Sequence, residues 1–128
     1  MKYLILIYHN TNALEAWERM SDAERVEGVR AHASLVEDLA NSGELVVSEA
    51  LADVSQARRV LVSGGRTTTT DGPFPEAKEY LAGFYLVECD TIDRAVGYAA
   101  RIPEAAIEGA VVVRPALLHT SEDGEPAG

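Results

Sequence analysis

The sequence is organised around residues 70–88, which read TDGPFPEAKEYLAGFYLVE. Gly72 and Pro73 favour a sharp turn directly after four threonines, whose β-branched side chains favour an extended strand. Residues 80–89 then form a long apolar segment, typical of a strand that is buried on both faces. Ionisable side chains are concentrated between these two strands, so we expect polar chemistry at this turn.

Strands and helices alternate on either side of this stretch. The predicted strands are residues 2–8, 44–51, 58–63, 66–70, 80–89 and 110–114, with Gly64-Gly65 as a hairpin turn. The predicted helices are a short one at 13–20, a long one at 21–42, and one that begins after Asp90 or Thr91 and ends at Pro103. This order is the split βαβ pattern of a ferredoxin-like α+β domain, with two main helices on one face of an antiparallel sheet.

The long helix has clear start and stop signals. Ser21 and Glu24 form a predicted capping box, and Gly43 is a typical residue after a helix end. His32 and Arg25 fall on the apolar side of this helix. That side is predicted to contain Val26, Val29, Ala33, Val36 and Ala40.

The predicted sheet has more apolar surface than two helices can cover. Residues 2–8, 80–89 and 110–114 are apolar on both faces, whereas two helices cover only one face. We therefore expect the second face to meet another subunit, and a two-fold homodimer is the simplest closure.

Composition limits the functional classes. The 128 residues fit one domain at 1–118, followed by a tail at 119–128 that is predicted to be acidic and disordered. The net charge of −10 argues against direct binding of nucleic acid or anionic lipid. The apolar start is too short to span a membrane, and Cys89, the single cysteine, is predicted to be buried in a strand. These features favour a soluble, cytoplasmic protein.

Several motifs together resemble one family. Asp71-Gly72-Pro73-Phe74 is followed by Lys78-Glu79, Gly83-Phe84-Tyr85 and Arg114-Pro115, and in these segments the chain resembles the YCII-related family, in the branch named after its Asp-Gly-Pro-Phe signature. The resemblance covers roughly residues 1–117. It implies a dimeric α/β barrel. Members of this branch are often encoded beside, or fused to, extracytoplasmic-function sigma factors.

His32 is the first candidate catalytic residue. Its side chain can exchange a proton near neutral pH if a carboxylate orients it, although a lone histidine on an apolar helix face is also a common core residue. The resemblance implies that a histidine on this helix is half of a His-Asp pair, with the Asp after the second helix. Residues 100–104 contain no Asp. Asp71 is the preferred substitute, with Glu76, Glu79 and Glu104 as weaker choices, and an ordinary turn residue is an equal interpretation of Asp71.

Four further residues are candidate binding residues. Lys78 could bind an anionic group or form a surface ion pair, and Glu79, the next residue of the strand, points to the opposite face. Tyr85 could present its hydroxyl to a cavity or serve in packing. Arg25 lies on the same helix line as His32. Trp17 is interpreted as a packing anchor.

No metal or cofactor motif accompanies these residues. His9, His32 and His119 are far apart, and the sequence contains no nucleotide-binding glycine loop. Two functions stay open. One is a cofactor-independent enzyme that acts on a small molecule by His/Asp acid-base chemistry. The other is a non-catalytic ligand-binding or regulatory dimer linked to a sigma factor.

Overall fold

The computed structural model describes residues 1–117, 119–120 and 126–127 of the protein. Four strands form an antiparallel sheet in the order β2-β5-β1-β6. They are β1 (Lys2–Asn10), β2 (Leu45–Ala50), β5 (Glu79–Glu88) and β6 (Val111–Pro115). Setting aside the hairpin inserted between β2 and β5, this is the order of a ferredoxin-like sheet, which confirms the expected α+β class.

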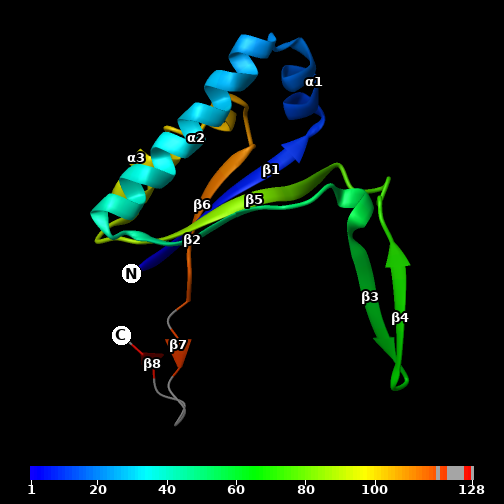
Figure 1. Ribbon diagram of the computed structural model, residues 1–128. Coiled ribbons are helices and arrows are strands. Elements are labelled where there is room, and N and C mark those ends of the chain that lie inside the picture. Colours follow the sequence, from blue (N-terminus) through cyan, green and yellow to red (C-terminus); the bar gives the residue numbers. More distant parts are fainter. Residues whose placement is uncertain (118, 121–125, 128) are drawn as a thin grey trace.

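The helices lie on one side of the sheet (Figure 1). They are α1 (Thr11–Arg19), α2 (Asp22–Ser42) and α3 (Ile92–Ala99), and short 3-10 turns occur at η1 (Val54–Gln56) and η2 (Pro103–Ala106). The capping box is confirmed, because Ser21 Oγ accepts from the Glu24 amide at 3.1 Å and Glu24 Oε1 accepts from the Ser21 amide at 3.0 Å. Gly43 ends α2 in the left-handed conformation, with φ of 78°.

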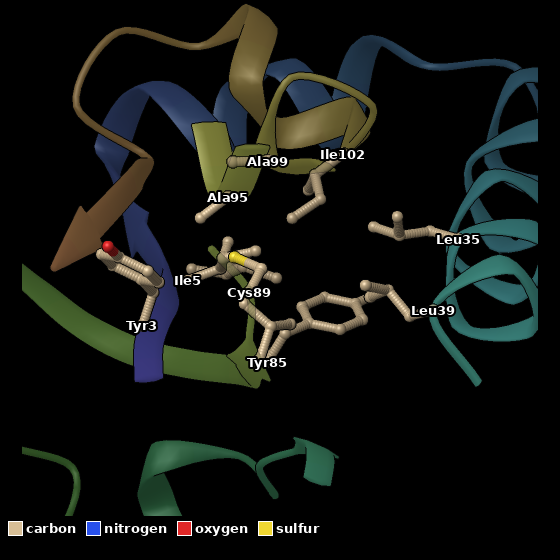
Figure 2. Close-up of a cluster of buried hydrophobic side chains, with 11 residues drawn as sticks. Tyr3, Ile5, Leu35, Leu39, Tyr85, Cys89, Ala95, Ala99 and Ile102 are labelled. Atoms are coloured by element: carbon tan, nitrogen blue, oxygen red, sulfur yellow. The ribbon is translucent and has the colours of Figure 1, made fainter. Parts of the chain in front are cut away.

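The core lies between the helices and the sheet. Alternation along β1 buries Tyr3, Ile5 and Ile7 against the helices, and Figure 2 shows Leu35 and Leu39 of α2 pointing into the same cluster. Cys89 is buried as expected, and burial raises the pKa of its thiol.

The predicted apolar side of α2 needs a correction. Leu35 and Leu39 are fully buried, whereas Val26 and Val29 are 50% and 67% exposed. Ala33 and Ala40 are exposed as well. The buried line is therefore rotated from the predicted one. Its residues recur at helical spacing in the order Arg25, Gly28, His32, Leu35 and Leu39.

A hairpin extends from the sheet on the side away from the helices (Figure 1). It consists of β3 (Arg58–Ser63) and β4 (Arg66–Asp71), and every residue of both strands is exposed. Gly64 and Gly65 form its turn with φ of 58° and 76°, as predicted.

The Asp-Gly-Pro-Phe turn fastens the base of this hairpin. Gly72 donates to the backbone oxygen of Ala57 at 2.7 Å, and a Cβ on Gly72 would collide with the backbone oxygen of Val54. Arg59 forms an ion pair with Glu76, and its guanidinium lies 4.0 Å from the centre of the Phe74 ring. The turn therefore holds η1 in place.

The second face of the sheet carries apolar side chains that the described chain leaves partly exposed. Leu4 pairs with Leu86 and Leu6 with Phe84, so these four residues share one face. All four are partly exposed, and Val47 and Val112 on the same face are 37% and 41% exposed. The expected homodimer through this face stays a prediction.

The C-terminal residues are described only in part. Strands β7 (His119–Thr120) and β8 (Pro126–Ala127) pair with each other. The rest of the predicted disordered tail, residues 121–125 and 128, lies outside the described residues, as does residue 118. None of the helices formed by the described residues is both long and apolar enough to cross a membrane.

Candidate active site

A cleft of about 870 Å³ lies at the N-terminal end of α2. Leu35 and Leu39 lie in the core. Towards the N-terminus of α2, the same side of the helix carries His32, Gly28 and Arg25, and these three residues line the cleft. Gly28 lies close to η2, since a Cβ at this position would be 3.9 Å from Pro103. The remaining walls come from the end of β1, the start of β5, α1, η2 and Asp53, the residue before η1.

His32 is held between two oxygen groups. Its Nδ1 lies 2.6 Å from the Tyr85 hydroxyl, and its Nε2 lies 2.9 Å and 3.1 Å from the two Glu104 carboxylate oxygens. The His32 and Glu104 side chains are 30% and 26% exposed, so both are only partly shielded from solvent. His32 and Glu104 line the cleft, and Tyr85 lies behind them with its ring in the core.

The protonation states of Tyr85 and Glu104, the two groups bonded to His32, follow from their surroundings. Burial, together with the charge of Glu104, raises the pKa of Tyr85 to about 12, so the phenol stays protonated. Burial would raise the pKa of Glu104, but the hydrogen bond and charge of His32, together with smaller contributions from a backbone hydrogen bond and His9, lower that pKa. An ionised Glu104 only accepts hydrogen bonds, so Nε2 of His32 donates to it and, in the neutral ring, Nδ1 accepts from Tyr85.

A second histidine enters the cleft from β1. His9 continues the alternation of Tyr3, Ile5 and Ile7, and therefore lies on the helix side of the sheet beyond the core. It pairs with Tyr80 of β5, and the two rings meet edge to face with centroids 5.8 Å apart.

A β-bulge places Tyr80 on this side. Ile7 pairs with Gly83 and Tyr8 with Leu81, so Ala82 is an extra residue in β5. Without it, the even-numbered Tyr80 would point to the face opposite Tyr85.

Trp17 and Arg25 form the outer wall. Trp17 is 50% exposed, and the Arg25 guanidinium lies 4.8 Å from the centre of its ring. Arg25 also donates from Nη2 and Nε to the Trp17 backbone oxygen at 2.7 Å and 3.2 Å. These bonds join the end of α1 to the first turns of α2, so the cleft has an aromatic wall beside a fixed positive charge.

The structure brings three of the six candidate residues together, namely His32, Tyr85 and Arg25. It does not place Asp71 with His32. Asp71 is exposed at the end of β4, where its Oδ1 lies 3.4 Å from Nε of Arg58. Lys78 and Glu79 are exposed and do not line the cleft, so their binding roles stay predictions.

Several cleft residues do not stand out in the sequence. Glu104 is only a weaker candidate there and Trp17 is predicted to serve in packing, whereas His9, Tyr80 and Asp53 carry no site prediction, yet all five line the cleft. Alternation along β1 could have placed His9 on the helix side. Nothing local marks Glu104, because its position depends on how η2 docks on α2. Within the described residues, no cluster of three or more His, Cys, Asp or Glu side chains is arranged to hold a metal ion.

Comparisons with known proteins give a family and a fold. Residues 1–117 match the model of the YCII-related domain. The chain is 33% identical over 120 residues to an uncharacterised protein of Rhizobium meliloti (strain 1021), covering 93% of this chain and 94% of that protein. It resembles the structure of 5-chloro-2-hydroxyhydroquinone dehydrochlorinase from Burkholderia phenoliruptrix AC1100 in complex with 2,5-dihydroxybenzoquinone, with a TM-score of 0.50, 14% identity, and coverage of 98% of this chain and 100% of the other. At this identity the likeness shows the fold alone.

Proposed function

Because the chain belongs to the YCII-related family and carries a hydrogen-bonded His32–Glu104 pair in a cleft, we propose that it is an enzyme that moves protons on a small molecule without a cofactor. The main support is the hydrogen-bonded series Tyr85–His32–Glu104. The Tyr85 hydroxyl lies 2.6 Å from His32 Nδ1, and a Glu104 carboxylate oxygen lies 2.9 Å from His32 Nε2, at the wall of a cleft large enough for a small organic molecule.

Glu104 is the general base in this proposal. Both ring nitrogens of His32 are engaged, so the carboxylate is the member of the chain that can receive a substrate proton at the cleft surface. His32 orients Glu104 and stabilises its charge, and Tyr85 fixes the ring of His32. Glu104 replaces Asp71 in the expected histidine–carboxylate pair.

This arrangement suits eliminations and isomerisations. The base takes a proton from carbon, and the electron pair of the broken C–H bond forms a new double bond. In an elimination the leaving group then departs with its bonding electrons. In an isomerisation the proton returns to a different carbon. Neither reaction consumes an oxidant or reductant.

A planar ring with hydroxyl or carbonyl groups is the proposed substrate class. The cleft presents the Trp17 ring for stacking, and His9, Arg25 and Asp53 for hydrogen bonds to polar substituents. The structurally similar dehydrochlorinase, which acts on a hydroxylated hydroquinone, is consistent with this class.

Solvent exchange tests the proposal without a known product. The purified protein is incubated in D₂O with chlorinated and unchlorinated hydroxyhydroquinones and hydroxybenzoquinones, and proton NMR follows the loss of C–H signals while chloride release is measured in parallel. We expect Glu104→Gln to slow the enzyme-dependent exchange by about 100-fold or more, because the amide cannot act as a base.

Glu108→Gln is the matched control. It makes the same chemical change in an exposed side chain that does not line the cleft, and it should leave exchange unchanged. Equal exchange by wild-type and Glu104→Gln protein would contradict the proposal. Absence of exchange from all compounds would favour the regulatory alternative.

The homodimer is part of the same proposal. The shared apolar face of Leu4, Leu6, Phe84 and Leu86 is the contact surface, and the projecting β3–β4 hairpin lies on the same side of the sheet (Figure 1). Val60, Leu61 and Val62 on the hairpin are 64–66% exposed, which is unusual for three consecutive apolar residues of a monomer. A second copy on this face would cover both surfaces.

A further inference from the structure

The two cleft histidines differ in their free hydrogen-bonding capacity. His32 uses Nδ1 for Tyr85 and Nε2 for Glu104. For His9, in contrast, no hydrogen-bond partner of either ring nitrogen occurs among the residues that the structure describes, although its ring is exposed in the cleft. His9 is therefore the imidazole that can bond to a ligand without losing an existing partner.

The backbone holds His9 firmly for such a role. Tyr8, the residue before His9, donates from its amide to the backbone oxygen of Ala110 at 2.7 Å. Asn10, the residue after His9, caps α1, because its side-chain oxygen accepts from the Ala13 amide at 2.8 Å. Tyr80 contacts the imidazole edge to face. A side chain on a paired strand with a ring packed against it is positioned more accurately than a side chain on a loop.

His9 lines the same cleft as the proposed base, Glu104. Burial raises the pKa of Glu104 and the His32 hydrogen bond lowers it, and the charge of His9 makes a smaller contribution that also lowers it. The Glu104 carboxylate thus has one imidazole hydrogen-bonded to it and a second imidazole in the same cleft. Simultaneous proton transfer at two atoms of one substrate needs two separate groups, and these positions supply them.

We propose that His9 is a second proton-transfer residue of the cleft, which takes the proton of a ring hydroxyl while Glu104 acts on a neighbouring carbon. In this step the hydroxyl O–H bond breaks, an N–H bond forms on the imidazole, and the ligand remains as an oxyanion beside the imidazolium. The same proton can return in the reverse direction. This inference rests on the proposed function, because it assumes that a hydroxylated ring enters the cleft.

Nitrocatechol is a suitable probe, because its visible absorption changes when a hydroxyl loses its proton. Trp17, the only tryptophan, lines the cleft, so quenching of its fluorescence reports binding separately from ionisation. The absorption of the bound probe is titrated with pH for the wild type, His9→Gln, Glu104→Gln and the control His119→Gln, which makes the same change near the C-terminus.

We expect the wild type to bind the probe and to lower its apparent ionisation pKa by about one unit or more, a tenfold change in the ionisation equilibrium. His9→Gln should still quench Trp17 but abolish most of this shift, whereas Glu104→Gln and His119→Gln should retain it. A bound probe that ionises equally in wild-type and His9→Gln protein would overturn the inference. Failure of the wild type to bind millimolar probe would overturn it as well.

The two proposals fail in different ways. The deuterium-exchange comparison depends on Glu104, and the ionisation comparison depends on His9. Loss of the ionisation shift only in Glu104→Gln would remove His9 from the mechanism and leave the proposed base in place.

Discussion

The Nε2 atom of His32 lies 2.9 Å from a carboxylate oxygen of Glu104, although the two residues are 72 positions apart in the sequence. The contact joins the middle of α2 to the 3-10 turn η2, which begins at Pro103. It changes the identity of the acid in the candidate site from Asp71 to Glu104. It also places that acid where η2 meets α2, whereas Asp71 pairs with Arg58 at the base of the hairpin.

Because the buried side of α2 contains Leu35 and not Val29, replacing each of these side chains by alanine should affect the free energy of unfolding differently. Leu35→Ala should lower the free energy of unfolding by about 2–5 kcal/mol, because Leu35 is fully buried and its removal leaves a cavity. Val29→Ala should change it by less than about 0.5 kcal/mol, because this side chain is 67% exposed. Urea unfolding measures both. A larger loss of unfolding free energy for Val29→Ala than for Leu35→Ala would show that the side of α2 predicted from the sequence is the buried one.

Local signals predicted most of the fold. The capping box at Ser21, the glycine after α2 and the diglycine hairpin turn each act within a few residues, and all three were correctly predicted. The face of α2 was less predictable, because Val29 and Leu35 are both apolar and only tertiary contact separates them. The N-terminal half of α2 covers the cleft instead of the core, which leaves Val26 and Val29 exposed.

The candidate site was only half predictable. His32 and Arg25 follow from the helical period, and they do share the cleft. Glu104 could not be preferred over Asp71, because its contact with His32 depends on the docking of η2. Tyr80 faces the cleft only because Ala82 is an extra residue in β5, and the sequence gives no clear sign of that bulge.

Gly72 provides a test of the signature turn. Gly72→Ala should destabilise the protein by about 1–3 kcal/mol, because a methyl group would collide with the Val54 backbone and displace η1. Gly97→Ala is the matched control, since nothing lies near its Cβ position within α3, and it should stabilise by roughly 0.5–1 kcal/mol. Thermal unfolding of both variants decides the point. Equal stability of the two would show that the turn tolerates a side chain.

Glu44 predicts a pH dependence of stability. Two hydrogen bonds from Arg94, at 2.5 Å and 2.7 Å, outweigh burial and, with a bond from Tyr98, lower the Glu44 pKa from 4.5 to about 2. The folded protein thus releases this proton more readily than the unfolded chain. The stabilisation is present above about pH 4.5 and is lost as the pH falls towards 2.

Glu44→Gln measures this contribution. At neutral pH the variant should be less stable than the wild type by about 1–2 kcal/mol, and the difference should shrink as the pH is lowered through this window. A difference that is constant from neutral to acidic pH would assign the effect to packing instead of charge. Chemical unfolding at a series of pH values provides the comparison.

The proposed homodimer predicts different effects of charge on the two sides of the sheet. Val47→Glu adds a charge to the apolar face opposite the helices and should shift the protein from dimer to monomer. Val96→Glu, in a 48% exposed position of α3, should leave the dimer intact. Sedimentation velocity distinguishes the species. A monomeric wild type, or a Val47→Glu dimer as stable as the wild type, would contradict the assembly.

The ¹⁵N NMR spectrum of the His32 imidazole tests the central contact most directly. The wild-type protein should show Nε2 protonated and Nδ1 accepting at neutral pH whenever the ring is neutral, and Glu104→Gln should shift both nitrogen signals. Asp71→Asn should leave them unchanged, because Asp71 pairs with Arg58. Signals that respond to Asp71→Asn and ignore Glu104→Gln would contradict the account and return the acid to the Asp-Gly-Pro-Phe turn.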